Sequence, residues 1–173
     1  STGAMLNAAL RRAGFRVGFY SSPHLVSVRE RFRIDGHPIG EEEFGALTAR
    51  FAPAVEDMKN AGRCPTYFEL TTAMAALCFA RHQTDFVIWE TGMGGRFDAT
   101  NVVSPLCSVI TGISLEHQEY LGDSIAKITF EKAGIIKWRT PVFTAATPPD
   151  AELVIREIAL ARPAPLHHVP PEW

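Results

Sequence analysis

The sequence predicts an α/β fold, with a mostly parallel sheet flanked by helices. Amphipathic helical patterns alternate with short apolar runs along the 173 residues, which is the rhythm of an α/β protein. Two runs, residues 86–89 and 107–111, are typical of parallel strands that are buried on both faces. We therefore expect an open sheet that binds its ligands beyond the carboxyl ends of the strands.

The first half of the chain carries clear boundary signals. Gly14 follows an amphipathic run with arginines in its last turn, which predicts the end of a helix. Three glutamates at 41–43 suit the positive end of a helix dipole, and Thr66 is a candidate N-cap. The expected elements are a helix over 4–13, strands over 16–20 and 32–34, a helix over 41–60, a helix with an apolar body over 73–79, and a strand over 86–89.

The second half continues the same alternation. We expect a strand over 107–111, a helix over 124–133, a strand over 141–144 and a helix over 151–160. The proline-rich residues 163–171 either lead into a last strand or are frayed.

The composition is that of an ordinary globular protein and excludes several functional classes. Hydrophobic residues make up 46% and charged residues 21%, so a disordered chain is excluded. The formal net charge of −2 gives no reason to expect a nucleic acid or a membrane as partner. Three cysteines, Cys64, Cys78 and Cys107, are far apart, which favours free and mostly buried thiols in a reducing compartment.

Polar, ionisable residues follow three of the expected strands. Ser22 and His24 follow the first, Glu90 follows the run 86–89, and His117 follows the run 107–111. A hydroxyl, a carboxylate and an imidazole at one sheet edge suit Mg²⁺ or Mn²⁺. The alternative is that each residue simply caps its own loop.

A glycine-rich loop, residues 92–95, allows tight turns and a close approach of the backbone to a ligand. Its spacing is not the dinucleotide fingerprint, because Met93 and Arg96 interrupt it and no helix obviously begins there. Arg96 beside Asp98 is compatible with either a surface ion pair or a phosphate clamp.

Five sequence blocks in a fixed order carry a family resemblance. They are Ser21-Ser22-Pro23-His24-Leu25, Phe68-Glu69, the thirteen residues from Glu90 to Val102, the run from Leu115 to Gly122, and the run from Glu131 to Lys137. This set closely resembles the folylpolyglutamate synthase/dihydrofolate synthase family of the Mur-ligase superfamily. The resemblance spans nearly the whole chain.

The resemblance implies a fold and an activity. The fold would be the central domain of a Mur ligase, which is P-loop NTPase-like, and it would be incomplete here. The activity would be ATP-dependent: phosphorylation of the terminal carboxylate of dihydropteroate or a folate, then attack by the amine of L-glutamate to give an amide, ADP and phosphate. The enzyme would be cytoplasmic and monomeric.

The resemblance also implies roles for individual residues. The Mg²⁺ ligands would be Ser22, Glu90, His117 and Lys132, with Lys132 carbamylated so that its neutral amine becomes an anionic oxygen ligand. Among these, Glu90, His117 and Lys132 would be catalytic. The nucleotide would contact Ser1, Thr2, Asn101 and Arg96. The pterin or folate would contact Ser22, Pro23, His24 and Phe68, the last of these by stacking on a flat ring. Without the resemblance, Lys132 would be a helix-terminal lysine facing solvent or Glu131.

Two departures from the family pattern bear on activity. Glu116 stands where the family usually has Asp, which lengthens the side chain by one methylene. The phosphate-cradling loop would precede Ser1, so residues 1–173 are expected to be a partial ATP-binding domain without that loop and without the C-terminal domain. We expect such a fragment to be inactive. The alternatives are a Mur-type ligase of peptidoglycan precursors and a non-catalytic nucleotide-binding module.

Overall fold

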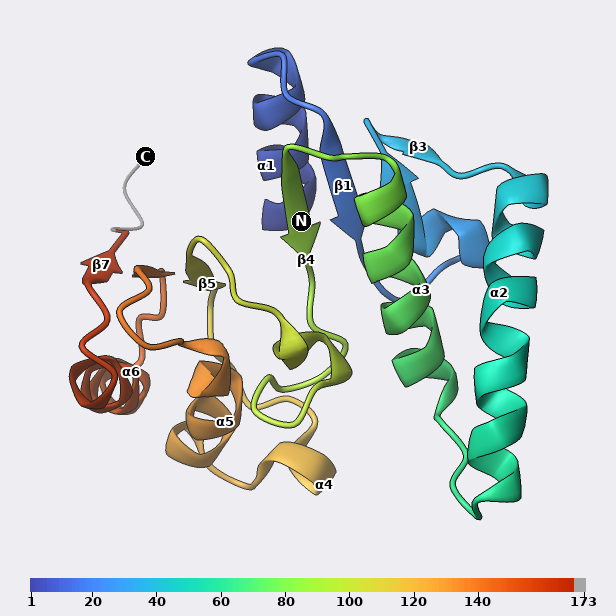
Figure 1. Cartoon of the computed structure of the whole chain (residues 1–173). Coiled ribbons are helices and arrows are strands. Elements are labelled where there is room, and N and C mark those ends of the chain that lie inside the picture. The colour runs from blue at the N-terminus through green and yellow to red at the C-terminus, as the bar shows by residue number, and fades with distance from the viewer. Residues whose placement is uncertain (170–173) are drawn as a thin grey trace. The chain divides into compact units, whose positions relative to one another are not determined.

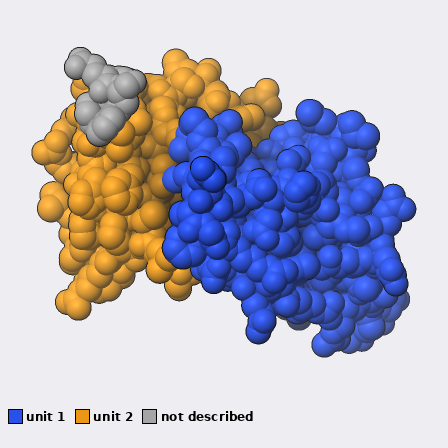
Figure 2. Space-filling model, turned by 90° about the horizontal axis from the view of Figure 1, so that it is seen from above, with its two compact units in different colours: residues 1–92 blue, residues 93–173 orange. Residues whose placement is uncertain are grey.

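The computed structural model describes residues 1–169, and these form two compact units that meet in sequence after Gly92. Figure 2 colours the two units separately. Each unit has its own sheet and its own hydrophobic core, so each is described by itself. No helix of the described residues has the length and apolar character that crossing a membrane requires. The expectation of one ATP-binding domain over residues 1–173 stays a prediction.

The first unit is built on a four-stranded mixed sheet (Figure 1). Its elements are α1 (Thr2–Arg12), β1 (Val17–Tyr20), the 3-10 helix η1 (Val28–Arg31), β2 (Phe32–Ile34), β3 (His37–Pro38), α2 (Glu41–Asn60), α3 (Tyr67–Arg81) and β4 (Phe86–Trp89). The strand order is β3-β2-β1-β4. Strands β1 and β4 are parallel, whereas β2 is antiparallel to both of its neighbours.

Helices α1 and α3 cover opposite faces of this sheet (Figure 1). A Cβ on Gly3 of α1 would lie 3.1 Å from the Phe19 ring, and a Cβ on Gly18 of β1 would lie 2.7 Å from the ring of Phe79 in α3. Because Phe19 and Gly18 are consecutive in a strand, they face opposite sides. The core of the unit therefore lies on the α3 side, around Tyr20, Phe32, Leu47 and Met74.

The boundary signals of the first unit are confirmed. Gly14 follows the cap of α1 with a φ of 92°, a left-handed conformation that glycine adopts without strain. The Thr66 hydroxyl accepts from the Glu69 amide while the Glu69 carboxylate accepts from the Thr66 amide, which completes a capping box. Strand β3 was not predicted, because it has only two residues and one of them is a proline.

The second unit contains a three-stranded parallel sheet in the order β5-β6-β7. Its elements are η2 (Ala99–Val102), β5 (Ser108–Ile110), α4 (Gln118–Leu121), α5 (Ile125–Lys132), η3 (Ala133–Ile135), β6 (Val142–Thr144), α6 (Pro149–Ala161) and β7 (Leu166–His168). The proline-rich segment thus leads into a strand, and its end at 170–171 lies outside the described residues. The short helix α4 was not predicted.

Two expectations about burial are wrong. Strands β4 and β5 are edge strands of their sheets rather than strands buried on both faces, and Val87 and Val109 are 43% and 39% exposed. The three cysteines are free, but only Cys78 is buried. Cys64 lies between α2 and α3 and Cys107 lies just before β5, in connections that run over the surface.

Candidate functional site

The carboxyl ends of β1 and β4 bring three groups of the first unit to one edge. The two strands run parallel with Tyr20 opposite Trp89, and the Glu90 amide donates to the Tyr20 carbonyl at 3.1 Å. Ser22 and Glu90, which follow these strands, therefore lie at the same sheet edge. Helix α1 begins at this edge as well, since Gly3 of its first turn packs against Phe19 near the end of β1.

The start of α1 holds two of the predicted nucleotide residues. Ser1 is the N-cap, and its hydroxyl accepts from the Ala4 amide at 3.4 Å, while Thr2 is the first helical residue. The first amides of a helix lack intrahelical acceptors and carry the positive end of the helix dipole, which attracts anions. The edge thus combines an anion-binding feature with a hydroxyl and a carboxylate.

Glu90 supplies the carboxylate of this edge. It is half-buried, and burial raises the pKa of its carboxyl above the ordinary value of 4.5. No cationic side chain among residues 1–169 forms an ion pair with it. A half-buried carboxylate without a cationic side chain is suited to a divalent cation, which favours oxygen ligands.

Residues 21–27 form a loop braced by a single carboxylate. Glu30 accepts hydrogen bonds from the amides of Leu25, Val26 and Ser27 at 2.9, 3.1 and 2.8 Å. The bonds from Leu25 and Ser27 lower the pKa of Glu30. The Ser22–Pro23 peptide bond is cis. The predicted substrate residues Ser22 and Pro23 lie in this loop, just before the braced amides.

His24 of the same loop is oriented by a buried arginine. Arg31 donates from Nε to Nδ1 of His24 at 2.9 Å, and its guanidinium lies 5.4 Å from the Tyr67 ring centroid. Because the arginine only donates, Nδ1 of His24 is the acceptor and Nε2 carries the ring proton. Sequence reasoning missed Glu30 and Arg31. The capping-box spacing Ser27-x-x-Glu30 was the signal that would have found this brace.

Phe68 packs inside the first unit. Its ring centroid lies 5.9 Å from that of Tyr20, and a Cβ on Gly92 would lie 2.6 Å from the tip of the ring. Gly92 therefore has a packing reason to be glycine. The stacking of Phe68 on a substrate ring stays a prediction.

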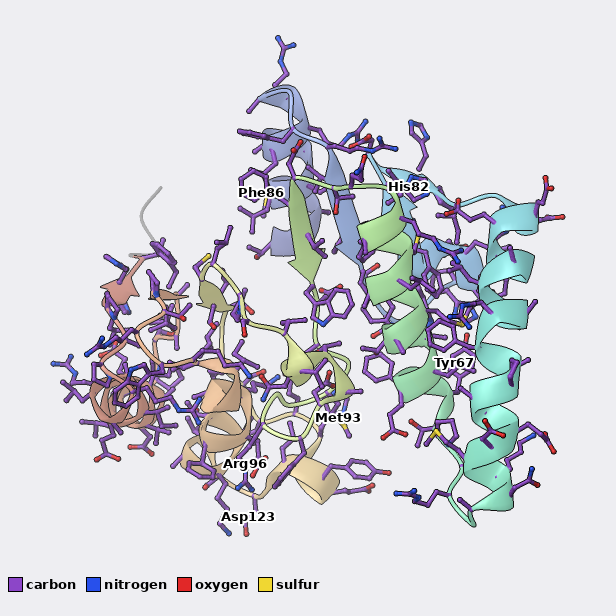
Figure 3. All side chains as sticks on the ribbon, in the orientation of Figure 1. Tyr67, His82, Phe86, Met93, Arg96 and Asp123 are labelled. Atoms are coloured by element: carbon purple, nitrogen blue, oxygen red, sulfur yellow. The ribbon has the colours of Figure 1, made fainter. Side chains whose placement is uncertain are left out.

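In the second unit, Arg96 is paired within the protein. Its Nε and Nη2 atoms donate to the two carboxylate oxygens of Glu131 at 3.2 and 2.7 Å, and its guanidinium lies 4.1 Å from the Phe97 ring centroid and 4.9 Å from that of Phe130. Arg96 is thus part of an ion pair with Glu131, and its role as a phosphate clamp stays a prediction. Figure 3 labels Arg96 beside α5.

The glycine-rich loop packs against the end of α5. A Cβ on Gly95 would lie 2.7 Å from the Lys132 carbonyl oxygen, and a Cβ on Gly134 would lie closer still to the backbone of Arg96. The Asn101 side chain donates to the carbonyls of Arg96 and Gly134 at 3.1 and 3.3 Å. These glycines and Asn101 thus hold the loop to the helix, and the predicted nucleotide contacts of Arg96 and Asn101 are untested.

The remaining predicted residues also lie in the second unit. Lys132 pairs with Glu116 at 2.9 Å rather than with Glu131, and Lys132 lowers the pKa of Glu116. His117 is exposed and begins α4 in a left-handed conformation with φ 52°, seven residues beyond the end of β5. Such backbone is sparsely populated for residues other than glycine and clusters at functional sites. That His117 and Lys132 join Ser22 and Glu90 stays a prediction.

Comparisons with curated proteins point to one family. The chain is 48% identical over 168 residues to a dihydrofolate synthase/folylpolyglutamate synthase of Bacillus subtilis, covering 95% of this chain and 39% of that protein. It is 39% identical over 175 residues to the mitochondrial folylpolyglutamate synthase of Bos taurus, covering 99% of this chain and 30% of that protein. The chain thus spans less than half of these relatives. No protein-family model matches it.

Solved structures give the same answer. A folylpolyglutamate synthase (FPGS) complex with AMPPCP and folate superposes with a TM-score of 0.89 at 35% identity, covering 94% of this chain and 40% of that one. Escherichia coli FolC in complex with DHPP and ADP superposes with a TM-score of 0.85 at 37% identity, covering 94% of this chain and 38% of that one. The expected Mur-ligase fold and its incompleteness are thereby confirmed. Over the stretch compared, this chain belongs to the folylpolyglutamate synthase/dihydrofolate synthase family.

Proposed function

We propose that the protein carrying this chain is an ATP-dependent amide-forming ligase that adds L-glutamate to dihydropteroate, to folates or to both. The observation that carries the proposal is the edge of the first unit, at which the start of α1 lies and at which β1 and β4 end, just before Ser22 and Glu90. A ligand with both phosphates and a divalent cation matches these groups. The ATP-analogue, folate and DHPP complexes of the structural relatives support the same choice.

The residues of this edge fit Mg²⁺. Glu90 supplies a carboxylate that no cationic side chain of the described residues neutralises, and Ser22 supplies a neutral oxygen. In our proposal these two hold the ion together with His117 and a carbamylated Lys132. Bound there, Mg²⁺ would supply positive charge opposite the negative charge that develops on the phosphate during the reaction.

The proposed reaction has two steps. A carboxylate oxygen of the pteroate or folate attacks the γ-phosphorus of ATP, and ADP leaves. The amine of glutamate then attacks the acyl carbon, loses a proton and expels phosphate. The chain contributes positioning: Ser22, Pro23, His24 and Phe68 hold the pterin-bearing substrate, and the braced loop fixes the His24 ring with Nε2–H as its donor.

Lys132 is the proposed site of a carbamate. In the structure its ammonium is paired with Glu116, and its side chain is 22% exposed. Addition of CO₂ requires that this ion pair open and that the amine lose a proton, after which the anionic carbamate is repelled by Glu116. The nucleotide is proposed to contact Ser1, Thr2, Asn101 and Arg96. For Arg96 this contact requires sharing with Glu131.

One assay tests the proposal. The full-length protein is incubated with ATP, Mg²⁺, L-glutamate and either dihydropteroate or a folate, and ADP release is followed. We expect release that depends on both the pterin substrate and glutamate. Release that depends instead on a peptidoglycan precursor would identify a Mur-type ligase, and ATP binding without turnover would identify a non-catalytic module. Either result removes the proposal.

We further propose that the protein acts in the cytoplasm as a monomer. Three free cysteines without a disulfide among them support a reducing compartment. Size-exclusion chromatography with light scattering on the full-length protein tests the oligomeric state, and a mass of twice the chain contradicts it.

A further inference from the structure

Three potential metal ligands of different chemistry meet in the first unit. Cys78 lies in the last turn of α3 and His82 caps the carboxyl end of this helix, four residues further on, so the two lie on one face. Glu43 reaches them from the first turn of α2. Their ligand atoms lie within 4.8 Å of one another. Within residues 1–169 this is the one such cluster of His, Cys, Asp and Glu.

The cluster lies at the opposite end of the strands from Ser22 and Glu90. His82 ends α3 just before β4, and Arg16, which contacts it, immediately precedes β1. The cluster is therefore at the amino ends of β1 and β4, whereas the proposed active site is at their carboxyl ends. Figure 3 shows His82 at the carboxyl end of α3. The ligase reaction gives this cluster no role.

One carboxylate oxygen organises the cluster. Arg16 donates to Nδ1 of His82 at 3.1 Å, so Nε2 carries the ring proton and donates to Oε1 of Glu43 at 2.7 Å. The Cys78 thiol donates to the same oxygen at 3.8 Å. Two protons are thus held between three ligand atoms, in the place where a cation would replace them.

The donor set favours zinc over magnesium. A thiolate, an imidazole and a carboxylate are the ligands that Zn²⁺ takes, and three protein ligands leave a fourth position for water. Zn–S and Zn–N lengths of about 2.3 and 2.0 Å imply tetrahedral donor separations of roughly 3.3 to 3.6 Å. The Glu43–His82 separation would therefore have to widen slightly. The two side chains are 32% and 26% exposed, which leaves room for this movement and a path for the ion.

We propose that Glu43, Cys78 and His82 form a zinc-binding site that ties the start of α2 to the end of α3. When zinc takes Nε2 of His82, the ring proton moves to Nδ1, so Arg16 gives up its hydrogen bond. Arg16 is exposed and can turn to solvent. The site stabilises the first unit and lies apart from the residues proposed to bind ATP and folate.

Titration of the metal-free, reduced full-length protein with Co²⁺ and then Zn²⁺ tests the proposal. Cobalt bound by a thiolate gives a sulfur-to-metal charge-transfer band, which an oxygen-ligand Mg²⁺ site cannot give. We expect the band to appear, to be removed by one equivalent of Zn²⁺, and to persist in excess Mg²⁺. Zinc should also raise the thermal midpoint.

Matched variants assign the band to the cluster. Cys78→Ser should abolish the band. Glu43→Gln and His82→Gln, which alter partly exposed side chains, should each weaken cobalt binding by at least roughly tenfold. A loss of that size is already typical when a residue that only hydrogen-bonds to a metal ligand is removed. Cys64→Ser, at an exposed thiol, is the control and should keep the band. Absence of a band in the parent protein, or its survival in Cys78→Ser, overturns the proposal. Failure of the ligase assay leaves it untouched.

Discussion

The predicted site residues of the two units differ in how their charges are paired. At the edge of the first unit, Glu90 is half-buried and has no cationic side-chain partner among the described residues. In the second unit, Arg96 is joined to Glu131 by two hydrogen bonds, and Lys132 is joined to Glu116. A carboxylate without a cationic side-chain partner is available to a ligand, whereas the paired charges of the second unit hold loops in place. The proposed metal site is therefore best tested at Glu90.

The largest expected effect is a loss of turnover. It tests whether the Glu90 carboxylate is a ligand. Glu90→Gln keeps the size of the side chain and removes its charge, so we expect the rate to fall by at least about 10²–10³-fold, as for loss of one preorganised electrostatic group. ADP release by the full-length variant measures this. A near-normal rate would show that the unpaired carboxylate is not a ligand.

The same variant should be slightly more stable than the parent. Because burial raises the pKa of Glu90, the folded protein holds the proton more tightly than the unfolded chain does. Stability is therefore lost as the pH rises from the ordinary value of 4.5 through the raised value, and at neutral pH the ionised group is unfavourable. Thermal melts of the variant at pH 7 should show a higher midpoint. A lower midpoint would indicate that the folded protein contains a group that stabilises the ionised Glu90 carboxylate.

The next largest expected effect is the loss of folding stability when a glycine in the loop of the second unit is replaced by alanine. In Gly95→Ala the new Cβ would meet the Lys132 carbonyl at 2.7 Å and Ile135 at 2.8 Å, so we expect a loss of about 1–3 kcal/mol, the usual cost of overpacking. Gly45→Ala is the control. Gly45 lies inside α2 with no atom near its Cβ position, and the change should stabilise by roughly 0.5–1 kcal/mol. Urea unfolding measures both.

Removal of Arg96 distinguishes a structural role from a nucleotide contact. Arg96→Ala leaves Glu131 without its partner and removes two ring contacts. We expect a loss of stability of about 1 kcal/mol, since the Arg96 side chain is 40% exposed. Lys127→Ala, which breaks the exposed pair with Asp123, should cost only a few tenths. A large rise in KM for ATP with unchanged stability would instead make Arg96 a phosphate ligand.

The smallest effect concerns the Lys132–Glu116 pair. Lys132 lowers the pKa of Glu116, so the contribution of the pair is complete above the ordinary value of 4.5 and is lost as the pH falls through the lowered value. In Glu116→Gln this part of the acid dependence should disappear, while stability at neutral pH falls by less than about 1 kcal/mol, because the pair is partly exposed. Unfolding measured from pH 3 to 7 tests this, and an unchanged profile contradicts it.

Local signals in the sequence predicted the elements, and parallel pairing predicted part of the site. The caps at Gly14 and Thr66 depend on neighbours within a few residues, and both are confirmed. Ser22 and Glu90 were expected at one edge because the carboxyl ends of parallel strands share one edge of a sheet, and they lie there. Each of these inferences needs only chain direction and local chemistry.

Contacts between residues that are far apart in the sequence could not be predicted from such local signals. Glu131 lies 35 residues from Arg96, and Glu43 lies 39 residues from His82, so nothing local indicates either pair. The helical spacing of Cys78 and His82 was visible, yet without the packing of α2 on α3 it had no third ligand. The glycines at 94 and 95 were interpreted as a ligand loop, because the helix that contacts them lies far along the chain.

The brace on residues 25–27 has a consequence for the thermodynamics of binding. Leu25 and Val26 are 90% and 91% exposed, yet Glu30 fixes their amides. An exposed apolar tip usually loses backbone entropy when a partner orders it, at a cost of about 1–2 kcal/mol per residue. Here much of that entropy is lost during folding. A ligand that covers this tip therefore gains from apolar contact with little penalty for ordering the loop.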